Sequence, residues 1–141
     1  MLKLILTMGY PHTGKTTWSR NSGHVVVCMD SLRKRLTNTA GKIPTAEPMV
    51  LATARLFVEC LFDSGQETVV IDYLNLRRSD RDFWIGPWDR QVKRFGGLEL
   101  TDLYLKRLQA RLGKPRGQKE HARWMGLWQD VEPEEGFIAL P

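Results

Sequence analysis

The chain has 141 residues, which is enough for one sheet-and-helix core but too few for two independent cores. Hydrophobic residues make up 42% of it and charged residues 26%, a balance typical of a globular rather than a disordered chain. The formal net charge of +5 suits a polyanionic partner, either the phosphates of a nucleotide or a nucleic-acid backbone.

The cysteines and the N-terminal segment indicate the cellular compartment in which the protein is expected. Cys28 and Cys60 lie in apolar segments and form no CxxC pattern, so we expect packed free thiols rather than a disulfide or a metal pair. The apolar run at residues 2–8 is too short for a secretory signal or a membrane span. We therefore expect a cytoplasmic protein without a membrane partner.

The first elements alternate strand and helix patterns. The apolar run at residues 2–8 ends at a glycine and predicts a buried parallel strand, and residues 15–20 then open a helix. The β-branched run at residues 24–29 predicts a second strand, which stops at Asp30. A helix or turn is expected to begin at Ser31.

The middle of the chain continues this alternation. Residues 39–48 contain one glycine and two prolines and predict a loop, and residues 49–64 have apolar positions at helical spacing. A third buried strand is expected at residues 68–71, ending at Asp72. Residues 80–95 are expected to be partly helical, with an interruption at a Gly-Pro pair.

The last third is expected to be mainly helical. In order, the patterns predict a fourth strand at 98–100, a helix at Thr101–Leu112, a basic loop at 113–117, a second helix at 118–129 and an extended tail at 131–141. Short strands that alternate with helices imply βαβ units. The sequence therefore predicts one α/β domain over residues 1–141, with a small parallel sheet of four or five strands between helices in three layers.

A phosphate-binding motif follows the first strand. It reads Gly9-Tyr10-Pro11-His12-Thr13-Gly14-Lys15-Thr16 and satisfies G-x-x-x-x-G-K-[ST] between a strand and a helix. The glycines let successive N–H groups point at phosphate oxygens, and the helix N-terminus adds partial positive charge. Lys15 is predicted to bridge the β- and γ-phosphates of ATP or another nucleoside triphosphate, and Thr16 to ligate Mg²⁺. His12 would either touch a phosphate or remain an exposed loop side chain.

Two aspartates at strand ends are candidates for the general base of a phosphoryl transfer. A hydroxyl acceptor needs a carboxylate to orient it and take its proton. Asp30 fits this role, and Arg33, one turn later, would hold an acceptor phosphate; the alternative is that Asp30 only caps the helix from Ser31. Asp72 is the rival base, or the strand-end acid that supports Mg²⁺ through water.

A basic helix is the candidate for a lid. Arg107 and Arg111 are spaced i, i+4 beside the basic residues 114–116, and such arginines can stabilise charge on a transferred phosphoryl group. A solvated basic face would have the same pattern.

Taken together, these residues resemble the small P-loop kinase module of bacteriophage polynucleotide 5′-kinase and its relatives. The likeness rests on residues 4–9 with Gly14-Lys15-Thr16-Thr17-Trp18, on Asp30-Ser31-Leu32-Arg33, on residues 71–76 with Asp80-Arg81, and on Arg107 with Arg111; residues 134–137 match an acidic-Gly-Phe tail. Asn75 matches an asparagine of the family, but Leu74 stands where a threonine is usual, and His12-Thr13 replaces a pair of small residues.

The resemblance implies a three-layer P-loop kinase fold with a helical lid at about residues 103–117. It also implies that Thr17 joins the nucleotide site, that Asp30 is the general base, that Arg33 contacts the acceptor phosphate and that Arg111 contacts the ATP phosphates. A phage-infected host cytoplasm would be a natural location.

The acceptor is expected to be a nucleic acid. Five tryptophans include the helix-spaced pairs Trp84/Trp88 and Trp124/Trp128, and arginines and lysines surround the first pair. Such rings either stack on bases or pack in a core. The acceptor hydroxyl would be a 5′-OH end of DNA or RNA, or the hydroxymethyl group of a modified base such as 5-hydroxymethyluracil. The alternatives are a small-molecule kinase for a nucleoside, sugar or antibiotic, and a nucleotide-binding ATPase without an acceptor.

Overall fold

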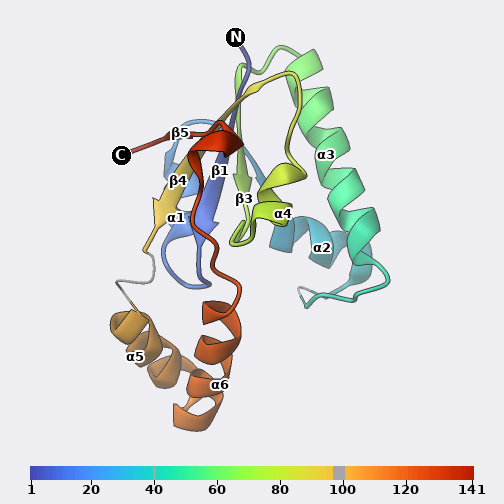
Figure 1. Ribbon diagram of the computed structural model, residues 1–141. Helices are drawn as coiled ribbons and strands as arrows, with labels where there is room; N and C mark the ends of the chain where they lie inside the picture. The colour runs from blue at the N-terminus through green and yellow to red at the C-terminus, as the bar shows by residue number, and fades with distance from the viewer. Residues whose placement is uncertain (40, 97–100) are drawn as a thin grey trace.

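A parallel β-sheet forms the centre of the computed structural model, which describes residues 1–39, 41–96 and 101–141 (Figure 1). Within these residues the sheet has five strands in the order β2-β3-β1-β4-β5. The strands are β1 (Lys3–Gly9), β2 (Val25–Cys28), β3 (Thr68–Asp72), β4 (Asp89–Phe95) and β5 (Ile138–Ala139). The predicted α/β fold class is confirmed.

Strand β1 lies in the middle of the sheet because its residues are apolar on both faces. It pairs with β3 from Lys3↔Thr68 to Leu6↔Ile71 and with β4 along its whole length, to Gly9↔Phe95. From Leu4 onward every residue of β1 is buried. This register brings the carboxyl ends of β1, β2 and β3 to one edge of the sheet, where ligands bind in open parallel sheets.

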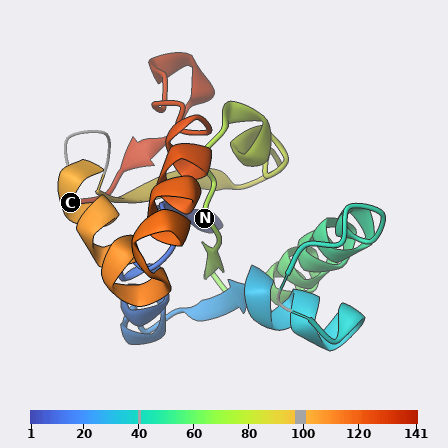
Figure 2. The same ribbon diagram turned by 90° about the horizontal axis from the view of Figure 1, so that it is seen from below.

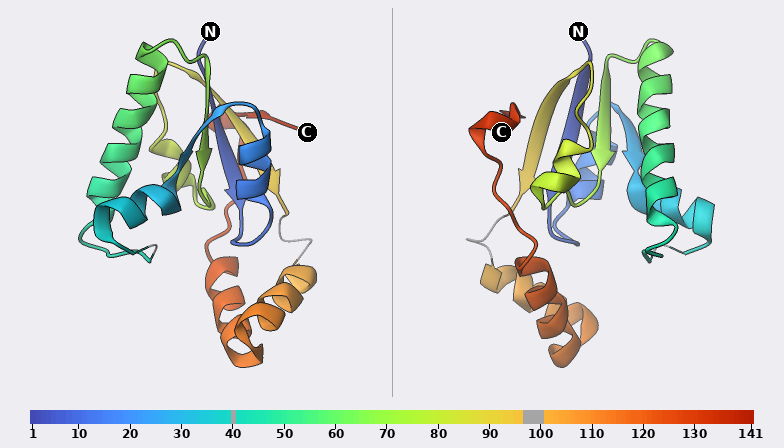
Figure 3. Two further views of the ribbon diagram at one scale, coloured as in Figure 1. Left: turned by 180° about the vertical axis from the view of Figure 1, so that it is seen from behind. Right: turned by 45° about the vertical axis from the view of Figure 1, so that its right-hand side comes forward.

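Helices cover both faces of the sheet. They are α1 (Lys15–Asn21), α2 (Met29–Thr37), α3 (Glu47–Asp63), α4 (Arg78–Asp82), α5 (Thr101–Leu112) and α6 (Lys114–Met125), with a short 3₁₀ turn η2 (Pro133–Glu135). Residues of α2 and α3 form one apolar cluster with alternate residues of β1 and β3, and Trp84, just after α4, belongs to it. Helix α1 lies on the opposite face (Figure 3), so the three-layer arrangement is present.

Three segments differ from the sequence predictions. Residues 89–95 form strand β4 rather than part of a helix, and α6 begins at Lys114, so residues 114–117 are helical rather than a basic loop. Proline is tolerated in the first turn of a helix, which is where Pro115 lies. Helix α2 begins at Met29, two residues earlier than predicted. The predicted strand at 98–100 lies outside the described residues.

Helices α5 and α6 form an antiparallel hairpin beyond the strand ends (Figures 1 and 3). Gly117 makes their close approach possible, because a Cβ there would lie 2.6 Å from the backbone nitrogen of Gln109. Seen from below, the hairpin and the α2–α3 pair lie on different sides of the strand ends (Figure 2). The hairpin is longer than the predicted lid at 103–117.

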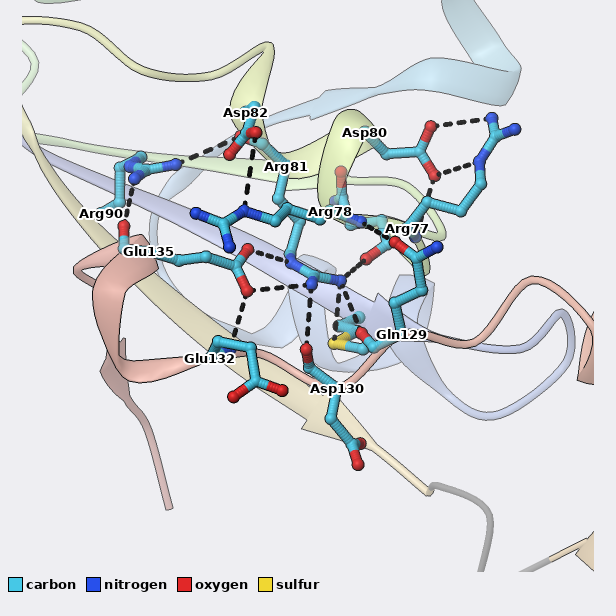
Figure 4. A network of polar contacts seen from close by, with 12 residues as sticks. Arg77, Arg78, Asp80, Arg81, Asp82, Arg90, Gln129, Asp130, Glu132 and Glu135 are labelled. Carbon is cyan, nitrogen blue, oxygen red and sulfur yellow. Dashed lines mark hydrogen bonds and ion pairs between the residues drawn. The ribbon is translucent and has the colours of Figure 1, made fainter.

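A buried ion pair joins α4 to the 3₁₀ turn that follows the hairpin (Figure 4). Arg81 and Glu135 have fully buried side chains and form a two-bond fork, with Nε donating to Oε1 at 2.8 Å and Nη2 to Oε2 at 3.1 Å. The remaining N–H groups of Arg81 donate to backbone carbonyls of Asn75, Leu76, Gln129 and Asp130. One guanidinium therefore holds together the loop after β3, the segment after α6 and the 3₁₀ turn.

The structure bears on two further predictions, that the cysteines are packed free thiols and that the chain has no membrane span. Both cysteines are free thiols, but Cys60 is exposed on α3 rather than packed, because it lies on the outer side of that helix. No helix in the described part of the chain is long and apolar enough to cross a bilayer.

Candidate active site

The loop between β1 and α1 has the backbone of a phosphate cradle. At Gly9 a Cβ would lie 2.6 Å from the carbonyl oxygen of Phe95, so only glycine fits beside β4. Gly14 has φ 99°, in the left-handed region, and is the N-cap of α1. These two glycines turn the chain so that the N-terminus of α1 faces the strand ends, where its free N–H groups can bind an anion.

Lys15 is buried in this loop, where its Nζ donates to the carbonyl oxygen of Tyr10 at 2.6 Å. Burial lowers the pKa of Lys15 to about 8, against the opposing effect of Asp72 and then Asp30. An ammonium group has three donors, so one carbonyl partner leaves it able to bind phosphate oxygens as well. This geometry fits the phosphate-binding role predicted for Lys15.

Thr16 and Asp72 meet at the end of β3. The Thr16 hydroxyl donates to Oδ2 of Asp72 at 2.8 Å, and the Asp72 side chain is almost completely buried. A hydroxyl beside a carboxylate provides two oxygen ligands of the kind Mg²⁺ prefers when phosphates and water complete its shell. The described residues hold no group of three or more His, Cys, Asp or Glu side chains that could bind a metal by themselves.

Asp30 lies on α2 and lines a cleft that Lys15, Thr16 and Asp72 also line. Its position differs from the prediction, because β2 ends at Cys28 and Asp30 lies in the first turn of the helix without capping it. Its carboxylate is exposed and accepts a hydrogen bond from Nη1 of Arg33 at 2.8 Å. The capping alternative is therefore wrong.

The guanidinium of Arg33 is held by two carboxylates. Besides Asp30, it donates from Nε and Nη2 to both oxygens of Glu47, at 3.0 and 2.8 Å. Arg33 is only 2% exposed, and the hydrogen bonds to Glu47 raise its pKa further. In this arrangement Arg33 fixes the carboxylate of Asp30, and its planar fork is occupied by Glu47.

These groups share one cleft of about 710 Å³ at the strand ends. Residues 11–17, Asp30, Arg33 and Asp72 line it together with Arg111. Of the two predicted lid arginines, only Arg111 lines the cleft; Arg107 is exposed on α5 and does not. The volume lies within the range of sites that enclose a cofactor or a drug-sized ligand, roughly 300–1,000 Å³.

Several lining residues were not predicted from the sequence. Lys42, Tyr73, Arg123 and Trp124 line the cleft, and Glu47 holds Arg33 behind it. Trp124 was assigned only to an aromatic pair, and Tyr73 lies in the 71–76 block of the resemblance but was given no role. The other three carried no motif. The signal that identifies them is spatial, since they come from four separate segments.

For Trp84 and Trp88 the core-packing alternative is confirmed, and the base-stacking alternative is wrong. Trp84 is completely buried, and Trp88 packs against Phe62 and donates from Nε1 to the carbonyl of Trp84 at 2.9 Å. The basic residues near them are also engaged. They pair with acids, rings or carbonyls of the chain itself, as Arg77, Arg78, Arg81, Arg90 and Lys93 do.

The fold and the loop define a P-loop protein with the architecture of the small P-loop kinases. The chain matches the model of the AAA_33 family, described as an AAA domain, over residues 4–122. The chain belongs to this family and is a P-loop kinase of its type, which implies a nucleotide donor. No curated protein matches the chain.

Solved structures agree on the fold. A sugar kinase from Janibacter sp. HTCC2649, crystallised unliganded, matches with a TM-score of 0.69 and 18% identity, over 99% of this chain and 85% of that one. A gluconokinase from Sinorhizobium meliloti 1021 matches at 0.64 and 18%, over 97% and 81%. A chain of the Pnkp1/Rnl/Hen1 RNA repair complex matches at 0.63 and 20%, over 93% of this chain but 47% of that one. At these identities the likeness shows the fold alone.

Proposed function

We propose that the chain transfers the γ-phosphate of ATP to a hydroxyl of a small polar molecule, with Asp30 as the general base. The observation that carries this proposal is that the Asp30 carboxylate, exposed and fixed by Arg33, lines the same cleft as Lys15 and Thr16. A base and a phosphate cradle that face one cavity can bring a hydroxyl and a phosphoryl group together.

The donor side fits a nucleotide and a magnesium ion. The backbone of residues 9–17 would bind the phosphates, with the Lys15 side chain on the β- and γ-phosphates and Thr16 with Asp72 holding the metal. When bound, Mg²⁺ would neutralise charge on the phosphates. The hydrogen bond between Thr16 and Asp72 supports this division of roles, because it directs Asp72 toward the cradle and leaves Asp30 for the acceptor.

The acceptor side works through Asp30 and Arg33. The carboxylate of Asp30 accepts the hydrogen bond of the acceptor hydroxyl and takes its proton as the oxygen bonds to phosphorus, while the bond to the leaving ADP oxygen breaks. Arg33 acts as a positioning residue, since its fork with Glu47 sets the orientation of Asp30. Arg111 from α5 would stabilise the negative charge on the transferred group.

The size and charge of the cleft favour a small acceptor over a polymer. Trp84 and Trp88, which motivated the nucleic-acid hypothesis, pack against other residues of the chain. Most of the surrounding cations pair with acids, rings or carbonyls of the chain. Lys42 and Tyr73 line the cleft together with Asp30, and the Lys42 ammonium lies 5.2 Å from the centroid of the Tyr73 ring. The whole-length likeness to proteins named sugar kinase and gluconokinase is compatible with this acceptor class.

The test is transfer from radiolabelled ATP across a panel of acceptors. It includes gluconate, neutral sugars, nucleosides, 5′-hydroxyl DNA and RNA, and DNA with hydroxymethylated bases. We expect label on a small molecule, and a loss of about 10²–10⁴-fold in Asp30→Asn with ATP binding retained. Asp63→Asn, at the exposed end of α3, is the matched control. ATP turnover without label on any acceptor, unchanged in Asp30→Asn, would contradict the proposal and indicate an ATPase module.

One observation favours a nucleic-acid acceptor as the second candidate. Residues 101–125 contain seven lysines and arginines and two acids, so the α5–α6 hairpin carries the entire formal net charge of +5. A polyanion would be attracted to this hairpin rather than to the tryptophan pair.

A variant of the hairpin separates the two candidates. Arg116 and Lys119 are exposed on α6 and lie outside the cleft. In Arg116→Ala/Lys119→Ala, a nucleic-acid kinase should bind oligonucleotides more weakly, and its salt slope should fall by about one for each phosphate that these side chains neutralise. A small-molecule kinase should keep its acceptor KM.

A further inference from the structure

His12 occupies a backbone position in the phosphate-binding loop that favours glycine. Its φ is 64°, in the left-handed region where a side chain is disfavoured. Gly14, two residues later in the same loop, satisfies a similar requirement with glycine. An imidazole has therefore been placed where its own backbone opposes a side chain, and strain of this kind is commonly found at functional sites.

The two other non-glycine residues with positive φ among those described have structural explanations. Both are asparagines, which, like aspartate and histidine, occur in this region more often than other non-glycine residues. Asn38 is the C-cap of α2, with its N–H donating to the Lys34 carbonyl, and Asn75 donates from its amide to the carbonyl of Thr7 at 2.8 Å. His12 caps no helix, and within the described residues its imidazole makes no hydrogen bond.

The imidazole lies among the groups of the proposed reaction. It lines the cleft with Lys15, Asp30 and Arg111. Burial is the main cause that lowers the pKa of His12, followed by the charges of Arg111 and Lys15, while Asp30 opposes them. The ring is therefore neutral at pH 7, with one nitrogen able to donate and the other to accept a hydrogen bond.

We propose that His12 is an acceptor-binding residue that determines which hydroxyl compounds are phosphorylated. This inference rests on the proposed function. The ring hydrogen-bonds a polar group of the acceptor beside the hydroxyl whose proton goes to Asp30, and it adds no covalent step of its own. Because His12 and Asp30 line the same cleft, the imidazole ring limits the shape of the molecule that can present a hydroxyl to the γ-phosphate.

The test compares His12→Gly and His12→Asn with the wild-type chain on the best acceptor from the panel. His12→Gly relieves the backbone, so its Tm should be unchanged or up to about 4 °C higher. Its Kd for ATP should stay within about twofold, whereas the acceptor KM should rise about tenfold or more, as expected when a substrate hydrogen bond is removed. His12→Asn tolerates the same φ and can still donate and accept, so its KM should lie between the two.

Each outcome decides between the proposal and its rivals. His24→Asn, at the exposed segment before β2, is the control for the loss of a histidine. An unchanged acceptor KM in His12→Gly would overturn the role of His12 alone. A fall in Tm accompanied by weaker ATP binding would assign His12 to loop structure and also overturn it. No labelled product from the wild-type chain would instead reject the proposed function, and with it this role.

Discussion

Neutralising Glu135 should destabilise the chain far more than neutralising its neighbour Glu134. Glu135→Gln removes the charge that compensates Arg81, and both side chains are 0% exposed. Glutamine preserves the shape but presents an amide N–H₂ to a guanidinium that can only donate. The variant therefore leaves a buried positive charge whose other partners are backbone carbonyls.

The magnitude follows from the burial of the pair. Breaking a buried ion pair by removing one partner costs about 3–5 kcal/mol. For a chain of 141 residues, the entropy of unfolding converts each kcal/mol to about 3 °C, so we expect Tm to fall by about 10–15 °C. Glu134 pairs with Arg78 at 2.9 Å with its side chain 61% exposed, so Glu134→Gln should leave Tm almost unchanged.

Thermal unfolding followed by circular dichroism measures both variants against the wild-type chain. Equal Tm values for Glu135→Gln and Glu134→Gln would contradict this prediction, because they would mean that the buried charge of Arg81 needs no carboxylate partner for stability. Since Arg81 also holds the carbonyls of Gln129 and Asp130, early loss of protection from hydrogen exchange in residues 126–132 should accompany the fall in Tm.

Three further results are expected at the cleft. Phosphates bind protonated Lys15, whose pKa is about 8, so ATP affinity should be nearly full at pH 7 and fall as the pH rises through about 8. Calorimetry should find a Kd about tenfold higher at pH 9 than at pH 7, and a flat profile would contradict this. Gly9→Ala should abolish ATP binding because its Cβ would meet Phe95, whereas Gly126→Ala, with 3.8 Å of clearance, should not. Asp72→Asn should raise the Mg²⁺ concentration needed for half-maximal transfer by about 10–100-fold, and an unchanged Mg²⁺ titration would show that Asp72 does not support the metal.

Strand β4 shows why one element was not predicted. Its sequence, residues 89–95, is charged at most positions, and Val92 alone is fully buried. A polar strand is accepted here because β1 supplies the hydrogen-bond ladder and the apolar neighbour, and because Arg90 and Lys93 place their cations over Phe137 and Phe95. These partners are distant in sequence, so local pattern could not reveal the strand.

Local sequence patterns predicted the donor loop and the three apolar strands β1, β2 and β3. The loop is defined by eight consecutive residues whose conformational and chemical requirements are local, so a short pattern predicts it. Its determining residues are Gly9, Gly14, Lys15 and Thr16. The aspartates were singled out for a similar reason, since Asp72 ends β3 and Asp30 lies two residues after the end of β2, in the first turn of α2.

Which charges and rings are available to a ligand depends on contacts between residues that are distant in the sequence. Arg33 and Glu47 are 14 residues apart, and Arg81 and Glu135 are 54 apart, so neither pair is visible as a pattern. Pairing over such distances occupied most of the basic residues that suggested a nucleic-acid site, and core packing buried Trp84. The type of a residue sets which chemistry its side chain can perform. Whether that side chain is available to a ligand depends on the neighbours that folding places around it.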